Sequence, residues 1–288
     1  MDELFIVLQS MGNRTANPEL VKEIMCLMFD GYNRRKRNGT LYAGLKDIPK
    51  SLIVMYWNLA EKQELNEIYS KFKRKYIINE NDLENVHNRK ERLGLREVYD
   101  FISDFDDGHW LNLYIILKLH ALLYSKVDYP EFGGSFRTEN CCIESSDVTT
   151  TPHELVPKEI TALYSEFEEL LKLGRSINER KAHDELINYV DAVIRLKCKL
   201  IKIHPFKDGN GRTCRALVNL MFKQVNLPPV YIQKREKEEY IRAMDSALRN
   251  QDYDLIEGFY YYKLCDSIID LNFDISFDEA TIAPKTIK

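Results

Sequence analysis

Glycine and proline are scarce in this chain, which has 12 glycines and nine prolines among 288 residues. The two residues together make up ~12% of an average protein, well above their share here. Because both are excluded from helix interiors, their scarcity predicts a mostly helical fold. Charged residues (30%) and apolar residues (44%) are in ordinary globular balance, which argues against wholesale disorder. The length allows a sizeable core without disulfides or metals.

Three further features are absent, and each excludes a class of protein. No run approaches the ~18 apolar residues of a membrane-spanning helix, and the first residues, MDELFIVLQSMGNRT, lack the basic region of a secretory signal. A net charge of −4 and a pI of about 6.0 lack the basic excess of a dedicated nucleic-acid binder. The six cysteines show no CxxC pair, so we expect them to be reduced. These absences predict a cytoplasmic protein without a membrane or nucleic-acid partner.

Amphipathic helices are expected along most of the chain. Asn17 followed by Pro18 is typical of a helix start, and 51–75 is the next apolar-periodic stretch. The acidic residues 79–82 are expected to lead into a charged helix that runs to residue 100. Further helices are predicted over residues 110–125, 158–174, 179–203, 210–225, 236–248 and 255–271.

Two segments interrupt this helical pattern. The basic run Arg34–Arg37 follows the first helix, where cations complement the helix dipole, although a nucleic-acid or localisation patch remains an alternative. Residues 129–157 form a long irregular segment that contains Gly133, Gly134 and two adjacent cysteines. Loops of this length are usually functional or disordered. Residues 135–145 within it can form a short hairpin.

The chemistry-bearing segment is IHPFKDGNGRTCR, residues 203–215. His204 precedes a proline, which ends the helix there. Gly209, Asn210 and Gly211 supply flexible backbone before a new helix, whose free N–H groups form an anion site. Two arginines, Arg212 and Arg215, lie three residues apart and therefore project from one face of that helix. Their guanidinium groups suit bidentate phosphate contacts.

A carboxylate and an imidazole complete this segment. Asp208 can hold Mg²⁺ on a nucleotide, because such a metal needs only one or two protein carboxylates. With an ordinary pKa near ~6.5, His204 suits general-base work at neutral pH. The chain has no GxxxxGK[ST] loop and no kinase signature set. The segment therefore indicates phosphoryl or nucleotidyl transfer.

HPFKDGNGRTCR resembles the Fic family signature HPFx[D/E]GNGRxxR at every fixed position. Downstream residues 227–230 and 240–247, and upstream Phe136–Thr138 with Cys141 and Ile143, are similar to segments of that family.

The resemblance covers about residues 76–275. It implies an all-α, Fic-type helical core with a small β-hairpin flap and an N-terminal helical extension. We therefore divide the chain into an N-terminal helical region (1–75), an inhibitory helix with a linker (76–100), a Fic catalytic core (101–275) and a flexible tail (276–288).

The resemblance also implies a reaction. His204 would deprotonate a Ser, Thr or Tyr hydroxyl of a target protein bound at the flap, and that oxygen would attack the α-phosphate of ATP. AMP would join the target as pyrophosphate leaves, with Asp208 holding Mg²⁺. The nucleotide would contact Cys141, Cys142, Ile143, Glu144, Asp208, Gly209, Asn210, Gly211, Arg212, Thr213, Arg215 and Tyr240.

An inhibitory glutamate is a weaker part of the resemblance. Autoinhibited members carry [ST]xxxE[GN], and Glu84–Asn85 fits its last two positions, whereas Glu80 stands where Ser or Thr is expected. Glu84 would pair with Arg215 and misplace the γ-phosphate. In similar proteins this glutamate also supports removal of AMP, so a bifunctional enzyme is implied.

Several alternatives stay open from the sequence. The transferred group can be UMP, phosphate or phosphocholine, because the scaffold fixes phosphates more than bases. The enzyme can modify itself or form a homodimer. A non-catalytic regulatory or nucleic-acid-interacting module is the alternative outside the enzymes, although the intact His204, Asp208 and Arg212 argue against it.

Overall fold

The computed structural model describes residues 49–50, 53–54, 57, 64–105, 114–143, 146–180 and 182–272. Several expectations fall outside these residues: the helix start at Asn17, the basic run Arg34–Arg37, Glu144 of the expected flap, and the tail 276–288.

The described residues form helices, and the predicted all-α class is confirmed for them. They contain no β-strand, and one isolated antiparallel bridge joins Cys142 to Thr149. The helices are α4 (Glu64–Leu83), α5 (Arg89–Ser103), α6 (Tyr114–Leu123), α7 (Val156–Ala162), α8 (Tyr164–Arg180), α9 (His183–Ile203), α10 (Asn210–Gln224), α11 (Lys237–Asn250) and α12 (Asp254–Asn272). Short 3₁₀ turns lie at Pro130–Phe132, His153–Leu155 and Lys234–Glu236. None of the described helices is long and apolar enough to cross a membrane.

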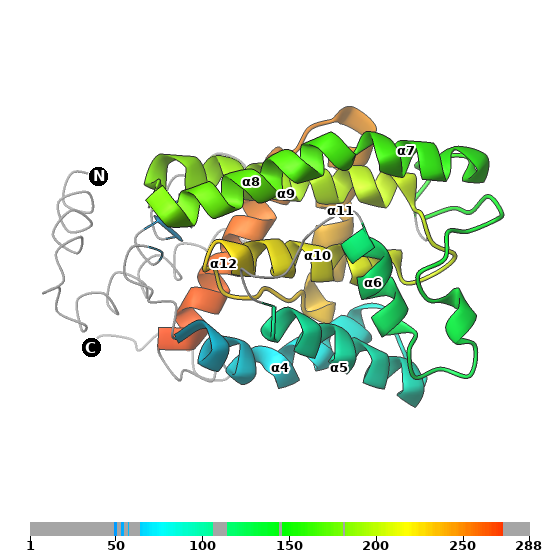
Figure 1. Cartoon of the computed structure of the whole chain (residues 1–288), viewed down its shortest axis with the longest axis horizontal. Helices are drawn as coiled ribbons and strands as arrows, with labels where there is room; N and C mark the ends of the chain where they lie inside the picture. Colours follow the sequence, from blue (N-terminus) through cyan, green and yellow to red (C-terminus); the bar gives the residue numbers. More distant parts are fainter. Residues whose placement is uncertain are drawn as a thin grey trace, which may run out of the picture.

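Helix α10 lies at the centre of the fold, with α8 and α9 on one side and α4 and α5 on the other (Figure 1). All of its residues except Gly211 are buried. Leu217, Leu220 and Phe222 supply apolar side chains to the core that surrounds it. The GNGR segment is therefore the first turn of the central helix, so the core fixes its position.

Close packing of α5 on α6 places two further elements beside that first turn. A Cβ atom added to Gly94 would lie 1.9 Å from the carbonyl oxygen of Leu123, so only glycine allows this crossing. The crossing brings Glu91 of α5 and Tyr124, just after α6, toward the start of α10.

The charged helix expected to run to residue 100 is α5, but the acidic residues 79–82 are not a separate segment that leads into it, because they belong to the end of α4. The side-chain amides of Asn79 and Asn81 donate to carbonyls one turn back, at 2.8 and 2.7 Å, and α4 continues through them to Leu83. Asn85 then takes a left-handed conformation (φ 53°) that turns the chain. Glu84 consequently lies in the turn after a helix, rather than on one. The predicted division at residue 75 stays a prediction, and α4 runs continuously across it.

Other predicted helix boundaries differ where packing or capping overrides local signals. The helix expected over 158–174 is two helices, α7 and α8, which meet at Leu163. Gly174 does not end α8, because it packs closely against Tyr189 and Gln224, where a Cβ would meet side-chain atoms at 3.1 Å. The expected helix from residue 179 begins instead at His183. The last three predicted helices agree with α10, α11 and α12 to within two residues.

Candidate active site

A cavity of about 280 Å³ lies between the α9–α10 loop, the end of α4, helix α11 and residues 142, 143 and 146. Most of the predicted site residues line it: Glu84, Cys142, Ile143, His204, Asp208, Gly209, Asn210, Gly211, Arg212, Arg215 and Tyr240. Cys141 and Thr213 are not part of the lining, and Glu144 lies outside the described residues. The lining combines the polar residues of the motif with apolar side chains, among them Ile201, Ile241, Met244 and Leu248.

His204 caps the C-terminus of α9 in a left-handed conformation, with φ 52°. Its Nδ1 lies 3.2 Å from the carbonyl oxygen of Ile201. A carbonyl can only accept, so this hydrogen bond places the proton on Nδ1 and the lone pair on Nε2. Burial lowers the pKa of His204 below its ordinary value, which keeps the imidazole neutral at pH 7. These are the properties of a general base.

Arg137 holds the backbone of His204 in place. Its Nε donates to the carbonyl of His204 at 2.7 Å, and its backbone N–H donates to Pro205 at 2.9 Å. The guanidinium also donates to Glu139 and Thr151, so it joins the irregular segment to the end of α9. The sequence analysis placed Arg137 in a flap hairpin and missed this role, because the carbonyl of His204 lies 67 residues away and a backbone partner leaves no side-chain pattern.

The loop 206–210 is closed by Asn210 and packed by Phe206. The Asn210 amide both accepts from the Phe206 N–H (2.9 Å) and donates to the Phe206 carbonyl (2.8 Å). Gly209 has φ 74°, and a Cβ there would lie 2.9–3.0 Å from Leu123 and Tyr124 atoms. Glycine is therefore required at the N-cap of α10. The first N–H groups of α10 have no intrahelical acceptor, as at any helix start, and these residues line the cavity.

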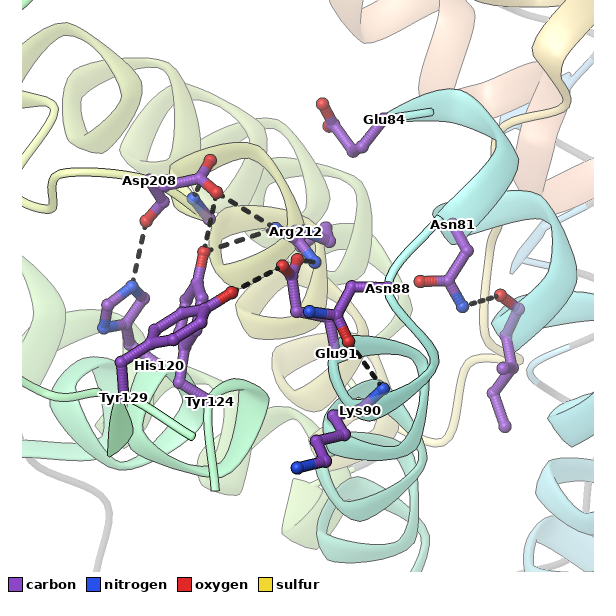
Figure 2. Close-up of polar contacts among 12 residues, drawn as sticks. Asn81, Glu84, Asn88, Lys90, Glu91, His120, Tyr124, Tyr129, Asp208 and Arg212 are labelled. Carbon is purple, nitrogen blue, oxygen red and sulfur yellow. Dashed lines mark hydrogen bonds and ion pairs between the residues drawn. The ribbon is translucent and has the colours of Figure 1, made fainter. Parts of the chain in front are cut away.

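Residues from the end of α6 support Asp208 from behind (Figure 2). The Tyr124 hydroxyl donates to Oδ2 of Asp208 at 2.9 Å, and Nε2 of His120 donates to its carbonyl at 2.9 Å. Nδ1 of His120 accepts from the N–H of Gly134, which fixes a neutral ring. Burial lowers the pKa of His120 to about 4, so the ring stays neutral. The sequence missed His120 and Tyr124, which lie in a run that is otherwise apolar.

Arg212 is buried and held by acidic groups. Its Nη1 lies 3.1 Å from Glu91 Oε2, and its Nη2 lies 3.6 Å from Asp208 Oδ2. The hydroxyl of Tyr129 donates to the other Glu91 oxygen at 3.1 Å (Figure 2). Glu91 thus fixes the orientation of the Arg212 guanidinium. The sequence analysis did not predict this contact, because the two residues lie 121 positions apart.

Arg215 contacts two carboxylates that come from the end of α4. Its Nη2 lies 2.5 Å from Glu84 Oε1, so the expected contact with Glu84 is present, although its inhibitory role stays a prediction. Its Nε lies 2.6 Å from Glu80 Oε2, a contact that the sequence did not predict. Burial favours the neutral acid of Glu84, but the charge and hydrogen bond of Arg215 outweigh it and lower its pKa. Burial dominates at Glu80 and raises its pKa.

The residues present fit a magnesium ion that arrives with a nucleotide. The Asp208 side chain is 69% exposed and lines the cavity. No group of three or more His, Cys, Asp or Glu side chains within the described residues could hold a metal ion alone. A single carboxylate therefore requires phosphate oxygens and water to complete the coordination of Mg²⁺.

Two solved structures have the same helical fold. A Fic domain containing signalling protein from Bacteroides thetaiotaomicron matches with a TM-score of 0.55 and 18% identity, over 76% of this chain and 94% of that one. Fic-1 from C. elegans matches with a TM-score of 0.57 and 17% identity, over 92% of this chain and 79% of that one. This likeness defines a Fic-type helical fold.

Sequence comparison gives the family. Residues 110–222 match the Fic/DOC family profile. The chain is 31% identical over 161 residues to "Protein adenylyltransferase Fic" of Aedes aegypti, and 32% identical over 132 residues to the protein of that name in Drosophila melanogaster. These matches cover 55% and 46% of this chain, but only 29% and 24% of the relatives. Residues 110–222 therefore match the Fic/DOC family, and the chain spans less than a third of the length of these relatives.

Proposed function

We propose that this protein transfers AMP from ATP to a Ser, Thr or Tyr hydroxyl of a target protein. The observation that carries the proposal is a single cavity lined by a neutral imidazole, an exposed carboxylate, a helix N-terminus and an arginine. The names of the mosquito and fly relatives support the choice of AMP. Retention of Gly209, Gly211 and Arg215 supports it as well.

The chemical step begins at His204. Nε2 takes the proton of the target hydroxyl, and the oxygen forms a bond to the α-phosphorus. The bond from that phosphorus to the bridging oxygen of the β-phosphate breaks, and pyrophosphate leaves. The target then carries AMP in a phosphodiester bond, and His204 releases its proton to solvent.

The α10 start and its neighbours would hold the phosphates. The first N–H groups of α10 and the Arg215 guanidinium are the hydrogen-bond donors that would bind the phosphate oxygens. Asp208, oriented by Tyr124, would hold Mg²⁺, which when bound neutralises phosphate charge. Tyr240 and the apolar side chains of the lining, Ile241, Met244 and Leu248, would accept the base.

The segment around Cys142 is proposed to hold the target. One isolated antiparallel bridge joins Cys142 to Thr149, so the pairing reaches beyond residues 135–145, where the hairpin was expected. The Ser146 hydroxyl donates to Asp245 of α11 at 2.7 Å, which fixes the segment beside the cavity. An extended target peptide can add to such an edge by backbone pairing.

Glu84 is proposed to restrain the reaction by occupying Arg215. The same carboxylate, which lines the cavity, can orient water for removal of AMP. Addition and removal of AMP would then share one site. Glu84 would restrain the addition by occupying Arg215 and would support the removal by orienting water.

The group transferred is tested by the position of the label. The Glu84→Gly protein is incubated with candidate targets and with itself, using ATP labelled at the α- or the γ-phosphate. We expect label on protein from α-labelled ATP alone. Label from γ-labelled ATP would show phosphate transfer instead, and stronger incorporation from UTP or CDP-choline would show a different donor. Absence of transfer from every donor, despite nucleotide binding, would favour a non-catalytic module.

The pH dependence of the rate of AMP transfer should follow the protonation of His204. The base acts only when neutral, and its pKa lies below the ordinary value because the ring is buried. The rate should therefore stay on its plateau as pH falls through ~6.5 and decline only at lower pH. Initial rates of the Glu84→Gly protein at saturating ATP, from about pH 5 to about pH 8, check this. An acid limb centred at or above ~6.5 would contradict it.

A further inference from the structure

Two carboxylates one helical turn apart hold Arg215, and they differ in exposure. Glu84 is 31% exposed and lines the cavity, whereas Glu80 is fully buried and lies outside the lining. Their contacts also differ, because Glu84 bonds Nη2 and Glu80 bonds Nε. A bound phosphate can therefore replace Glu84, but it cannot reach the position of Glu80.

Loss of the contact between Glu80 and Arg215 would be energetically costly. Its Oε2 bonds Arg215, while its Oε1 meets no hydrogen-bond donor among the residues that the structure describes. If Arg215 moved away, a buried carboxylate would lose its hydrogen-bonded cation, which is a severe penalty. Glu80 thus tethers the guanidinium more firmly than the exposed Glu84 does.

The surroundings of the pair restrict Arg215 further. The Arg215 guanidinium lies 5.9 Å from the ring centroid of Tyr240, which itself packs on Phe259. The hydroxyl groups of Tyr76 and Tyr260 are buried nearby and interact electrostatically with Glu80 and Arg215. With Nε fixed by Glu80 and one face covered by Tyr240, the Nη groups are directed toward the cavity.

We propose that Glu80 is a positioning residue that anchors Arg215 for the outer phosphates of the nucleotide. The inference rests on the proposed function, because it assigns Arg215 to a bound triphosphate. In the restrained state, Arg215 bridges Glu80 and Glu84. When the nucleotide binds, phosphate oxygens replace Glu84 while Glu80 keeps Nε, so the arginine changes one partner without changing its direction.

Glu80 can also weaken phosphate binding, through its charge. Its negative charge offsets that of Arg215 and disfavours a phosphate nearby. If this repulsion outweighed the anchoring, removal of Glu80 would tighten ATP binding. We expect the anchoring to dominate, because a long arginine side chain without a buried partner loses its fixed orientation.

Binding of ATP and AMP to three proteins separates these effects: Glu84→Gly, and the same protein with Glu80→Ala or with Glu80→Gln. We expect Glu80→Ala to weaken ATP binding about tenfold and leave AMP binding unchanged, since AMP lacks the outer phosphates. Glu80→Gln keeps an oxygen acceptor for Nε and should restore most of the affinity. Glu67→Ala, on the exposed face of α4, is the matched control.

The outcomes are distinct. Unchanged or tighter ATP binding by Glu80→Ala would overturn the anchor, as would an equal loss for ATP and AMP, which indicates general disruption of the cavity. Thermal melting of each variant identifies such disruption. If ATP binds as expected but no AMP is transferred, the proposed function fails while the anchor stands. If neither nucleotide binds the Glu84→Gly protein, both fail.

Discussion

Replacing His204 with alanine in the Glu84→Gly protein should abolish AMP transfer, lowering its rate by about 10²–10⁴-fold. The target hydroxyl is a weak nucleophile at neutral pH, and His204 offers the one neutral imidazole that lines the described cavity. Its Nδ1 bond to Ile201 leaves Nε2 to take the proton. No other described group in the lining combines these properties, since Asp208 is committed to Tyr124 and Gly209.

The measurement is the initial rate of AMP incorporation, together with the affinity for ATP. Because His204 is proposed to act on the hydroxyl, ATP binding by His204→Ala should stay within about threefold of the parent, a difference below 1 kcal/mol. His87→Ala is the matched control, since His87 is exposed in the segment between α4 and α5. AMP transfer by His204→Ala at the parent rate would refute the mechanism.

Removal of the Glu84 side chain should increase the rate of AMP transfer. Glu84→Gly in the natural sequence should raise AMP transfer at least about tenfold, which corresponds to about 1.4 kcal/mol of restored phosphate binding. Glu84 carries a lowered pKa, so it is ionised at neutral pH and competes with phosphate for Nη2 of Arg215. Its position after the last residue of α4 means that glycine there does not interrupt the helix.

Glu84→Gln tests whether charge causes the restraint. The amide keeps the size of the side chain and removes its charge, so we expect an intermediate rate. Rates are compared at matched ATP concentration, and melting temperatures show that folding is unchanged. Equal AMP incorporation by the natural protein and both variants would rule out restraint by Glu84.

Local sequence patterns predicted much of this fold because helices carry their own signals. The apolar spacing of the C-terminal half gave α10, α11 and α12 within two residues. The run HPFKDGNGR carries its chemistry within a few residues, so the loop and the central helix start could be anticipated. The acidic stretch 79–82 misled the prediction, because asparagine side chains can bond within a helix as well as cap one.

Contacts between distant segments could not be predicted in the same way. Glu91 meets Arg212 across 121 residues, Glu80 meets Arg215 across 135, and Arg137 binds the carbonyl of His204 across 67. Each depends on how helices pack, and nothing in the spacing of the sequence encodes it. Residues that can contact phosphate were therefore predictable from local patterns, whereas the residues that hold them in place are seen only in the structure.

The proposed reaction requires the cavity to hold ATP with its α-phosphate beside His204. A crystal structure of the Glu84→Gly protein with a non-hydrolysable ATP analogue tests it most directly. We expect the outer phosphates to lie on the α10 N-terminus and on the Nη groups of Arg215, with Glu80 still on Nε and the α-phosphate next to Nε2 of His204. An analogue bound outside the cavity, or with its α-phosphate out of reach of His204, would show that this site does not transfer AMP in the proposed way.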